Sequence, residues 1–307
     1  MVKLPQVTII VLNWNGLNDT VQCLESLSRL DHPFYEIVVV DNDSTDGSVP
    51  AIRARYPDVV IIETGENLGY TGGNNVGIRY ALGRGADYVL LLNNDTVVDP
   101  AFLHILVDAA ETESAVGIAG PTIYYYERPD VIWSVGGAID WRRGSTRMMG
   151  LDERDEGQFG QVPRTVDFVT GCALLVKRAV LAQVGLLDER FFTYYEETEW
   201  CMRVARAGFK ILHVPQAKIW HKISPIAREA SSQVHYYMTR NRLLFLKLAR
   251  AGIAPWLNTL LFDYGRTLLN WTLRPKWRPK ILQRQAMVQA ILDYGRGRFG
   301  KVEIVKG

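Results

Sequence analysis

The sequence contains few cysteines and no long uncharged apolar run, and each shortage excludes a class of protein. Its 307 residues include three cysteines, Cys23, Cys172 and Cys201, which are far apart and odd in number. They provide neither a disulfide framework nor the paired spacing of a zinc site, and they suit a reducing compartment. No stretch has the uncharged apolar length of a membrane span, and residues 1–16 lack a signal-peptide cleavage pattern. We therefore expect a cytoplasmic protein.

Net charge is also small, at +2, but it is unevenly distributed. Residues 231–307 contain 14 Lys and Arg against 3 Asp and Glu, a net charge of +11, which leaves −9 for residues 1–230. A basic segment after an acidic body favours an anionic partner, either a nucleic acid or a membrane surface. Within this segment, apolar residues recur at steps of four and three, at Leu257, Leu261, Tyr264, Leu268 and Trp271. Such a stripe suits lipid or protein better than nucleic acid.

We therefore predict that residues 231–307 form a basic, amphipathic, helical C-terminal region. We expect it to contact the membrane peripherally, on the inner face of the cell membrane, and not to bind nucleic acid. The alternative is that the stripe packs on residues 1–230 or on a second subunit, so an oligomer stays open.

Strand and helix patterns alternate along the first third of the chain. Short apolar runs typical of buried strands occur at residues 6–13, 35–42, 58–64 and 87–95. Helical patterns follow them at residues 18–30, 47–57, 72–85 and 101–113. This alternation predicts an α/β fold with a doubly wound, mostly parallel, Rossmann-like sheet.

Polar residues follow three of these predicted strands. Strand one ends at Asn13 and Trp14, strand two runs into the acidic and amide residues of 41–48, and strand four ends at Asn94 and Asp95. Each loop by itself is typical of an ordinary turn or helix cap. Because ligands of open α/β sheets bind at the carboxyl ends of the strands, the three loops together favour a shared site.

A later cluster of acids lies beside aromatic residues, in the sequence YYEETEW. Its members Glu196, Glu197 and Glu199 would have raised pKa values in partly apolar surroundings, which suits a general base. The alternative is a solvated helix start, where the helix dipole favours acids.

Six segments, in this order, resemble the family 2 inverting glycosyltransferases with the GT-A fold, and among them the bacterial rhamnosyltransferase-like branch. They are VTIIVLNWNG, IVVVDNDSTDGS, NLGYTGGNNVGI, LLLNNDTVVDP, TGCALLVKRAV and FFTYYEETEWCMRVARAGFKI, and they span most of residues 5–222. The resemblance implies a GT-A catalytic domain over residues 1–230, with a nucleotide-sugar-binding half to about 115 and an acceptor-side half from about 116. It also implies a nucleotide-sugar donor, a divalent cation (Mg²⁺ or Mn²⁺) and direct displacement at the anomeric carbon.

The resemblance further implies roles for individual residues. The last acid of the family's Asp-x-Asp motif is a metal ligand and falls on Asp95, and His221 falls where some members place a second ligand. The catalytic base is the second residue of an acidic pair, which is Glu197 here, after Glu196. Because Glu is one methylene longer than the family's Asp, either glutamate can be the one that reaches the acceptor. Nucleotide-sugar binding is implied for Leu12, Asn13, Trp14, Asp41, Asn42, Asn74 and Asn94.

We therefore expect an inverting glycosyltransferase of cell-surface polysaccharide biosynthesis. By resemblance, the donor is dTDP-L-rhamnose and the acceptor is a glycan or lipid-linked glycan. One alternative keeps the fold but uses a UDP-sugar, for example in a galactofuranosyl- or glucosyltransferase. Another is a non-catalytic nucleotide-sugar or glycan-binding protein, which the presence of both Asp95 and Glu197 disfavours.

Overall fold

Parallel strands form the first half of the sheet, in the computed structural model that describes residues 4–223 and 231–303. β1 (Val7–Asn13) pairs in parallel with β2 (Tyr35–Asp41) on one side and with β4 (Tyr88–Asn93) on the other, and β3 (Val60–Glu63) extends the sheet beyond β2. This arrangement confirms the predicted α/β sheet. The predicted end of the catalytic domain, residue 230, lies outside the described residues.

The second half of the chain adds strands of mixed direction. β11 (Ala173–Lys177) is antiparallel between β4 and β6 (Val116–Tyr125), and β12 (Lys210–His221) is parallel to β6. The short strands β5 (Thr96–Val98), β7 (Ile132–Ser134) and β10 (Arg164–Thr165) pair with the edges of β12 and β6. A separate hairpin consists of β8 (Gly137–Asp140) and β9 (Ser145–Met148).

Helices cover both faces of this sheet, so that alternate strand residues enter different cores. Ile9 and Val11 of β1 pack with α1 (Leu17–Leu27), α2 (Ser48–Arg55) and α4 (Phe102–Glu111). Ile10 faces the opposite core, which contains α3 (Gly69–Gly83), α5 (Arg178–Val184) and α6 (Glu196–Arg206). A strand covered on both faces is apolar at successive positions, which explains the uninterrupted apolar run in β1.

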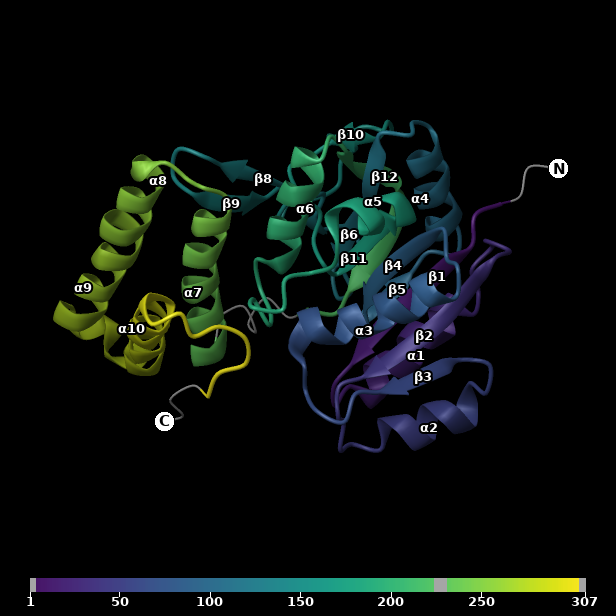
Figure 1. Cartoon of the computed structure of the whole chain (residues 1–307), viewed down its shortest axis with the longest axis horizontal. Coiled ribbons are helices and arrows are strands. Elements are labelled where there is room, and N and C mark those ends of the chain that lie inside the picture. Colours follow the sequence, from purple (N-terminus) through teal and green to yellow (C-terminus); the bar gives the residue numbers. More distant parts are fainter. Residues whose placement is uncertain (1–3, 224–230, 304–307) are drawn as a thin grey trace.

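The described C-terminal residues form helices that extend from one end of the sheet domain (Figure 1). They are α7 (Ser232–Leu248), α8 (Ile253–Leu257), the π-helical η2 (Asn258–Gly265), α9 (Arg266–Leu273), the 3₁₀ segment η3 (Pro275–Lys280) and α10 (Ile281–Gly295). Leu244, Phe245 and Leu246 of α7 are fully buried in the core that also contains α6. α7 therefore belongs to both the sheet domain and the helical region.

The apolar stripe predicted in this region divides between two faces. Tyr264 is buried with Leu268 and Trp271 packed around it, whereas Leu257 and Leu261 are 47% and 60% exposed. The π-helical segment η2 explains this difference in exposure. Its i→i+5 hydrogen bonds change the rotation about the helix axis from one residue to the next. Residues at helical spacing across η2 therefore do not share one face. Among the described residues, no helix is long and apolar enough to cross a bilayer.

Candidate active site

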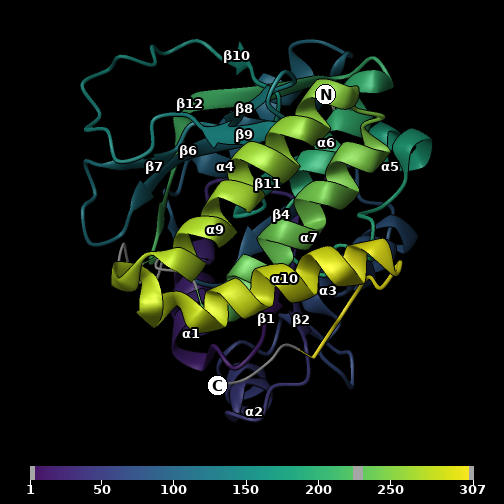
Figure 2. The same cartoon turned by 90° about the vertical axis from the view of Figure 1, so that its left-hand side faces the viewer.

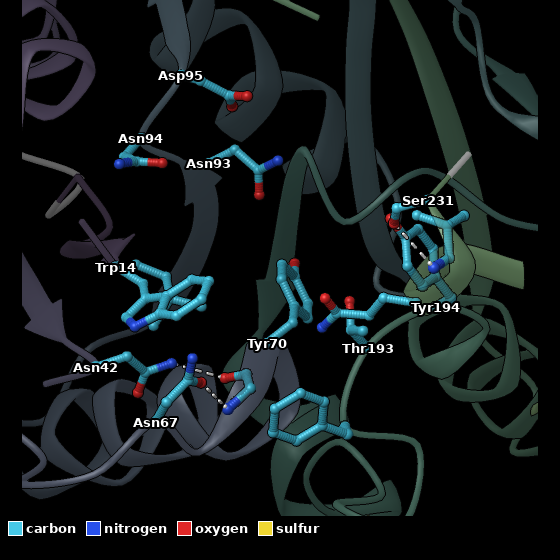
Figure 3. A pocket seen from close by; sticks show the side chains of 15 residues that line it. Trp14, Asn42, Asn67, Tyr70, Asn93, Asn94, Asp95, Thr193, Tyr194 and Ser231 are labelled. Carbon is cyan, nitrogen blue, oxygen red and sulfur yellow. Dashed lines mark hydrogen bonds between the residues drawn. The ribbon is translucent and has the colours of Figure 1, made fainter. Parts of the chain in front are cut away.

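A cavity of about 360 Å³ lies at the carboxyl ends of β1, β2 and β4. The first turns of α3, the segment before α6 and the start of α7 complete its walls (Figure 3). Its lining comprises Leu12, Trp14, Asn42, Asn67, Gly69, Tyr70, Asn93, Asn94, Asp95, Phe192, Thr193, Tyr194, Ser231, Gln233 and Val234. Of the predicted site residues, it therefore brings together Leu12, Trp14, Asn42, Asn94 and Asp95.

Hydrogen bonds between strand ends form the floor of this cavity. Asn13 is fully buried; its Nδ2 donates to Asp41 Oδ2 at 2.6 Å, and its Oδ1 accepts from Thr20 Oγ1 at 2.8 Å. Asn94 Nδ2 donates to Thr20 Oγ1 at 2.9 Å and to Asn13 Oδ1 at 3.2 Å. Asn13 and Asp41 thus lie beneath the cavity and fix the residues above them. Trp14 is 56% exposed and offers a free aromatic face.

The glycine-rich segment brings α3 close to the same floor. Asn42 Nδ2 donates to the Gly69 carbonyl at 2.9 Å, and a Cβ on Gly73 would collide with Leu12 Cδ1 and come within 2.9 Å of Asn42 Oδ1. Gly73 is therefore required for close packing of α3 on the strand ends. Asn74 is buried in α3 and does not line the cavity; its Nδ2 donates to the Tyr70 carbonyl at 2.9 Å.

Asp95 and His221 are 126 residues apart in sequence but in contact. The β5–β12 register pairs Thr96 with His221, which places His221 Nε2 3.0 Å from Asp95 Oδ1. Burial opposes ionisation of Asp95, but the hydrogen bond from His221 lowers the pKa of the carboxyl below its usual value. For His221, burial lowers the pKa, but the neighbouring Cys172 and Asp95 raise it to about 10.

These two side chains are of types that ligate metal ions. Within residues 4–223 and 231–303, no three His, Cys, Asp or Glu side chains converge on a point that could hold a metal ion. One carboxylate and one imidazole nevertheless fit a cation that takes its other ligands from substrate phosphates and water, as Mg²⁺ commonly does. Because a ligand imidazole must be neutral, a bound cation would displace the proton that the neighbouring Cys172 and Asp95 favour on His221.

The acidic pair lies at the first turn of α6, and its two members have different environments. Glu196 is only 4% exposed, and burial together with the charge of Glu197 raises its pKa far above the usual value. Glu197 is partly exposed, and its burial raises its pKa to about 7. A pKa of about 7 lets Glu197 exchange a proton at neutral pH. Neither glutamate lines the cavity, but Tyr70 does, and burial together with the charges of the two glutamates raises its pKa.

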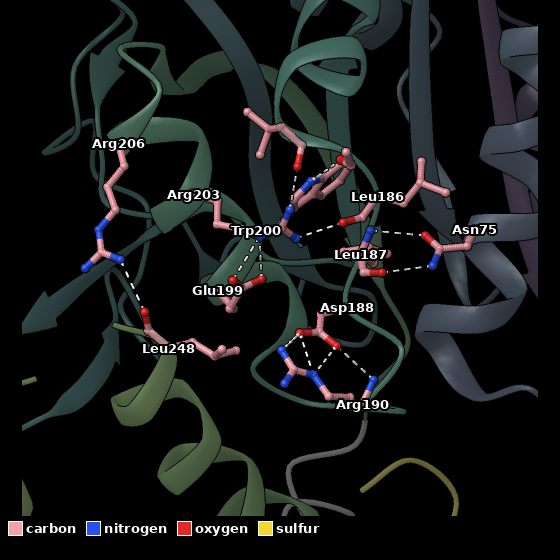
Figure 4. A network of polar contacts seen from close by, with 12 residues as sticks. Asn75, Leu186, Leu187, Asp188, Arg190, Glu199, Trp200, Arg203, Arg206 and Leu248 are labelled. Carbon is pink, nitrogen blue, oxygen red and sulfur yellow. Dashed lines mark hydrogen bonds and ion pairs between the residues drawn. The ribbon is translucent and has the colours of Figure 1, made fainter. Parts of the chain in front are cut away.

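The third acid of this cluster, Glu199, has a structural role. It is 3% exposed and pairs with Arg203 one turn later, with both carboxylate oxygens 2.8 Å from Arg203 Nε. Arg203 also donates to the carbonyls of Val184 and Leu186, at 2.8 Å each (Figure 4). The Glu199–Arg203 pair anchors α6 to the end of α5. Glu196 and Glu197, at the start of α6, are not part of this pair.

The backbone before α6 is strained. Phe192, Tyr194 and Tyr195 have φ values of 66°, 69° and 72°, in the left-handed region that L residues rarely adopt. Each such residue costs about 1–3 kcal/mol, and strain of this kind is concentrated at functional sites. The segment contains three cavity-lining residues and leads directly into Glu196, so its conformation positions both the wall and the acids.

Sequence reasoning did not identify several lining residues. Asn67 and Tyr70 lie in the glycine-rich segment, where the strand-to-helix transition was a usable signal. Thr193 and Ser231 could not be found in this way, because long-range packing brings them to the cavity.

Comparison with known proteins identifies the family of the chain. The family model for glycosyl transferase family 2 matches residues 8–185. The chain is 30% identical to an N-acetylglucosaminyl-diphospho-decaprenol L-rhamnosyltransferase of Mycobacterium tuberculosis, over 92% of each chain. It is 27% identical to the dTDP-rhamnosyl transferase RfbF of Shigella flexneri, over 86% of this chain and 87% of that one.

Solved glycosyltransferase structures share the fold at low identity. A mannosyltransferase of Pyrobaculum calidifontis, in complex with GDP-Man and Mn²⁺, superposes with a TM-score of 0.59 at 16% identity, covering 97% of this chain and 89% of that one. GalNAc-T7 with UDP, GalNAc and Mn²⁺ superposes with a TM-score of 0.66 at 16% identity, covering 96% of this chain and 58% of that one. The predicted GT-A fold is thereby confirmed.

Proposed function

The chain belongs to glycosyl transferase family 2, and from that premise we propose that it transfers L-rhamnose from dTDP-L-rhamnose to a lipid-linked glycan. The observation that carries the choice of sugar is the 30% identity, over 92% of each chain, to a protein named as a rhamnosyltransferase with a diphospho-decaprenol acceptor. The similarity to a dTDP-rhamnosyl transferase supports the same donor. The product would enter a cell-surface polysaccharide.

In this proposal the nucleotide lies on the strand ends. Trp14 presents an exposed ring to the base, Leu12 packs beneath it, and Asn42 lines the same wall while its amide nitrogen donates to the Gly69 carbonyl. Asp95 and His221 would hold a divalent cation, Mg²⁺ or Mn²⁺, which when bound offsets the negative charge that develops on the leaving nucleoside diphosphate. The predicted nucleotide-sugar-binding residues that do not line the cavity have a supporting role: Asn13 and Asp41 fix its floor, and Asn74 stabilises the first turn of α3.

Glu197 is the proposed base, and the reaction is a single displacement. The acceptor hydroxyl oxygen forms a bond to the anomeric carbon while the bond from that carbon to the diphosphate oxygen breaks. Glu197 takes the hydroxyl proton, a step typically worth about 10²–10⁴-fold in rate. Its pKa of about 7 suits a base at neutral pH, whereas burial and the charge of Glu197 raise the pKa of Glu196 well above its usual value and make its carboxylate harder to form.

Thermal unfolding with a panel of donors tests the assignment. With Mn²⁺ present, dTDP-L-rhamnose is expected to raise the melting temperature more than UDP-galactofuranose or UDP-glucose, because a ligand stabilises the state that binds it. Measurements with dTDP and UDP alone separate the contribution of the nucleotide to the melting temperature from that of the sugar. A metal-free series tests whether the stabilisation requires the cation. A larger shift with a UDP-sugar would retain the family and replace the donor; no shift with any nucleotide would contradict the function.

We further propose that the outer face of the C-terminal helices contacts an anionic membrane, at the cytoplasmic side where the lipid-linked acceptor is extended. Figure 2 looks onto this face, where α9 and α10 lie outermost. The exposed large apolar residues of α8, η2 and α9 are Ile253, Leu257, Leu260, Leu261, Phe262, Leu269 and Leu273. Exposed basic residues, including Arg266, Arg274 and Lys276, lie along the same segment. Each basic residue near an anionic leaflet contributes about 1 kcal/mol.

Vesicle co-sedimentation tests this contact. Wild type is expected to sediment with vesicles containing phosphatidylglycerol and not with pure phosphatidylcholine, and Leu261→Glu with Phe262→Glu should abolish binding. Val162→Glu is a matched control, since Val162 is 76% exposed on the sheet domain. A stable dimer that the same double substitution disrupts would instead assign this face to a second copy of the chain.

A further inference from the structure

The strained segment before α6 is held from outside by α7, which stands between α6 and the outer helices (Figure 1). Asn241 of α7 is fully buried. Its Nδ2 shares two hydrogens among the carbonyls of Phe191, Thr193 and Tyr194, at 2.9, 2.7 and 2.8 Å. All three carbonyls belong to residues next to or within the left-handed positions, so one amide fixes the path of the segment.

The neighbouring Arg240 is also fully buried and extends the same contact. Its Nη2 donates to the carbonyls of Arg190 and Phe191, at 3.2 and 3.0 Å, and its Nη1 donates to the Gly300 carbonyl at 2.8 Å. Its Nε donates to Asn241 Oδ1 at 3.0 Å, which fixes the orientation of the amide. A buried guanidinium that is directed at backbone carbonyls defines their position more closely than apolar packing would.

The other contacts of the segment do not replace this pair of residues. From α3, the Thr71 N–H donates to the Phe192 carbonyl at 3.2 Å. The Phe192 ring stacks on Tyr237, one turn before Asn241, with centroids 5.3 Å apart. The carbonyls of Thr193 and Tyr194, which lie nearest the acids, are bonded by Asn241.

We propose that Arg240 and Asn241 are positioning residues for the transfer reaction, which hold the left-handed segment 190–195 and thereby fix the place of Glu197. The inference rests on the proposed role of Glu197 as base. It makes the C-terminal helical region part of the catalytic apparatus, in addition to any role as a membrane contact. Because Phe192, Thr193 and Tyr194 also line the cavity, the same clamp shapes the wall opposite the nucleotide.

Replacing Asn241 with leucine, which has a similar shape but no donor, tests the proposal kinetically. Since Glu197 acts in the transition state, kcat is expected to fall by about 10²-fold, the scale of a small misplacement of a catalytic group, with a smaller change in the donor KM. Tyr264→Phe is the control: it removes a buried hydrogen bond to the Thr239 carbonyl of α7 but donates nothing to segment 190–195. It should keep the wild-type kcat.

The pH dependence of kcat/KM distinguishes a loss of positioning at Glu197 from a general loss of stability. The titratable groups that interact electrostatically with Glu197 are Glu196 and Cys201 on its own helix, Tyr194 and Tyr195 before it, and Tyr70 of α3. If the segment relaxes in Asn241→Leu, water reaches the carboxyl and the ascending limb of kcat/KM moves to lower pH. The proposal would be overturned if Asn241→Leu folds and has the same kcat, and the same position of the ascending pH limb, as Tyr264→Phe.

A double-mutant cycle tests the clamp without an activity assay. Glycine adopts positive φ without strain, so Asn241→Leu should lower the melting temperature less in a Tyr194→Gly background than in wild type. Additive losses would overturn the proposal. If Asn241→Leu does not fold alone, Arg240→Lys takes its place in both experiments. A wild type that binds no nucleotide would refute the proposed function while the cycle still reports on the clamp.

Discussion

Replacing Glu197 with glutamine is expected to abolish transfer and, at alkaline pH, to stabilise the folded protein. Burial raises the pKa of this carboxyl from its ordinary 4.5 to about 7. The folded state therefore binds more protons than the unfolded state between these values, and stability is lost as pH rises through the folded pKa. At 1.36 kcal/mol per pKa unit, ionised Glu197 lowers the free energy of unfolding above pH 7 by at most about 3 kcal/mol.

The assay is urea unfolding, followed by tryptophan fluorescence, at pH 5 and pH 8. Glu197→Gln is expected to have a higher free energy of unfolding than wild type, because glutamine carries no charge to desolvate. This difference should be about 1–3 kcal/mol larger at pH 8 than at pH 5. Asp188→Asn serves as a control, since hydrogen bonds from Arg190 outweigh burial and lower the pKa of Asp188. Asp188→Asn should lower the free energy of unfolding by a similar amount at pH 5 and at pH 8. Glu197→Gln should also lower kcat by about 10²–10⁴-fold with little change in donor affinity.

Two results would refute this reasoning. The first is a Glu197→Gln stability difference that is equal at pH 5 and pH 8, because the carboxyl would then titrate normally. The second is loss of transfer in Glu196→Gln with full activity in Glu197→Gln, which would move the base to the preceding residue.

Three further predictions concern the cavity. Asp95→Ala should abolish the Mn²⁺-dependent part of donor binding measured by calorimetry; a metal effect equal to wild type would remove Asp95 from the cation site. Trp14→Ala should weaken dTDP binding by about 1–3 kcal/mol, the usual worth of a base stacked on an aromatic ring, and fluorescence titration with dTDP would contradict this if the Kd stayed constant. Gly73→Ala should lower both the melting temperature and the donor affinity, because the new methyl group meets Leu12 and Asn42. Unchanged values of both would mean that α3 shifts without cost.

Some of this structure could be predicted from local sequence patterns. The alternation of strands and helices is local, so the parallel sheet and the polar strand ends at Asn13 and Asp95 followed directly from it. The contact between Asp95 and His221 depends on β5–β12 pairing across 126 residues, which spacing alone does not reveal. Family resemblance, rather than local physics, placed the two together.

Other features could not be predicted because tertiary contacts override local preference. Nothing in the residue types of Phe192 and Tyr194 favours positive φ, and the partner that holds them, Asn241, is nearly 50 residues away. In the C-terminal region, the π-helical turn moves Leu257 and Leu261 to a different face from Tyr264, which a pattern of fixed period cannot anticipate.

The most direct test of the central claim is the anomeric configuration of the product. The enzyme would be incubated with dTDP-L-rhamnose, Mn²⁺ and a short-chain polyprenyl-diphosphate N-acetylglucosamine acceptor, and the one-bond C1–H1 coupling of the new rhamnoside measured by NMR. The account predicts a rhamnoside with the configuration opposite to that of the donor, formed by wild type and not by Glu197→Gln. A product that retains the donor configuration would contradict a single displacement with Glu197 as base.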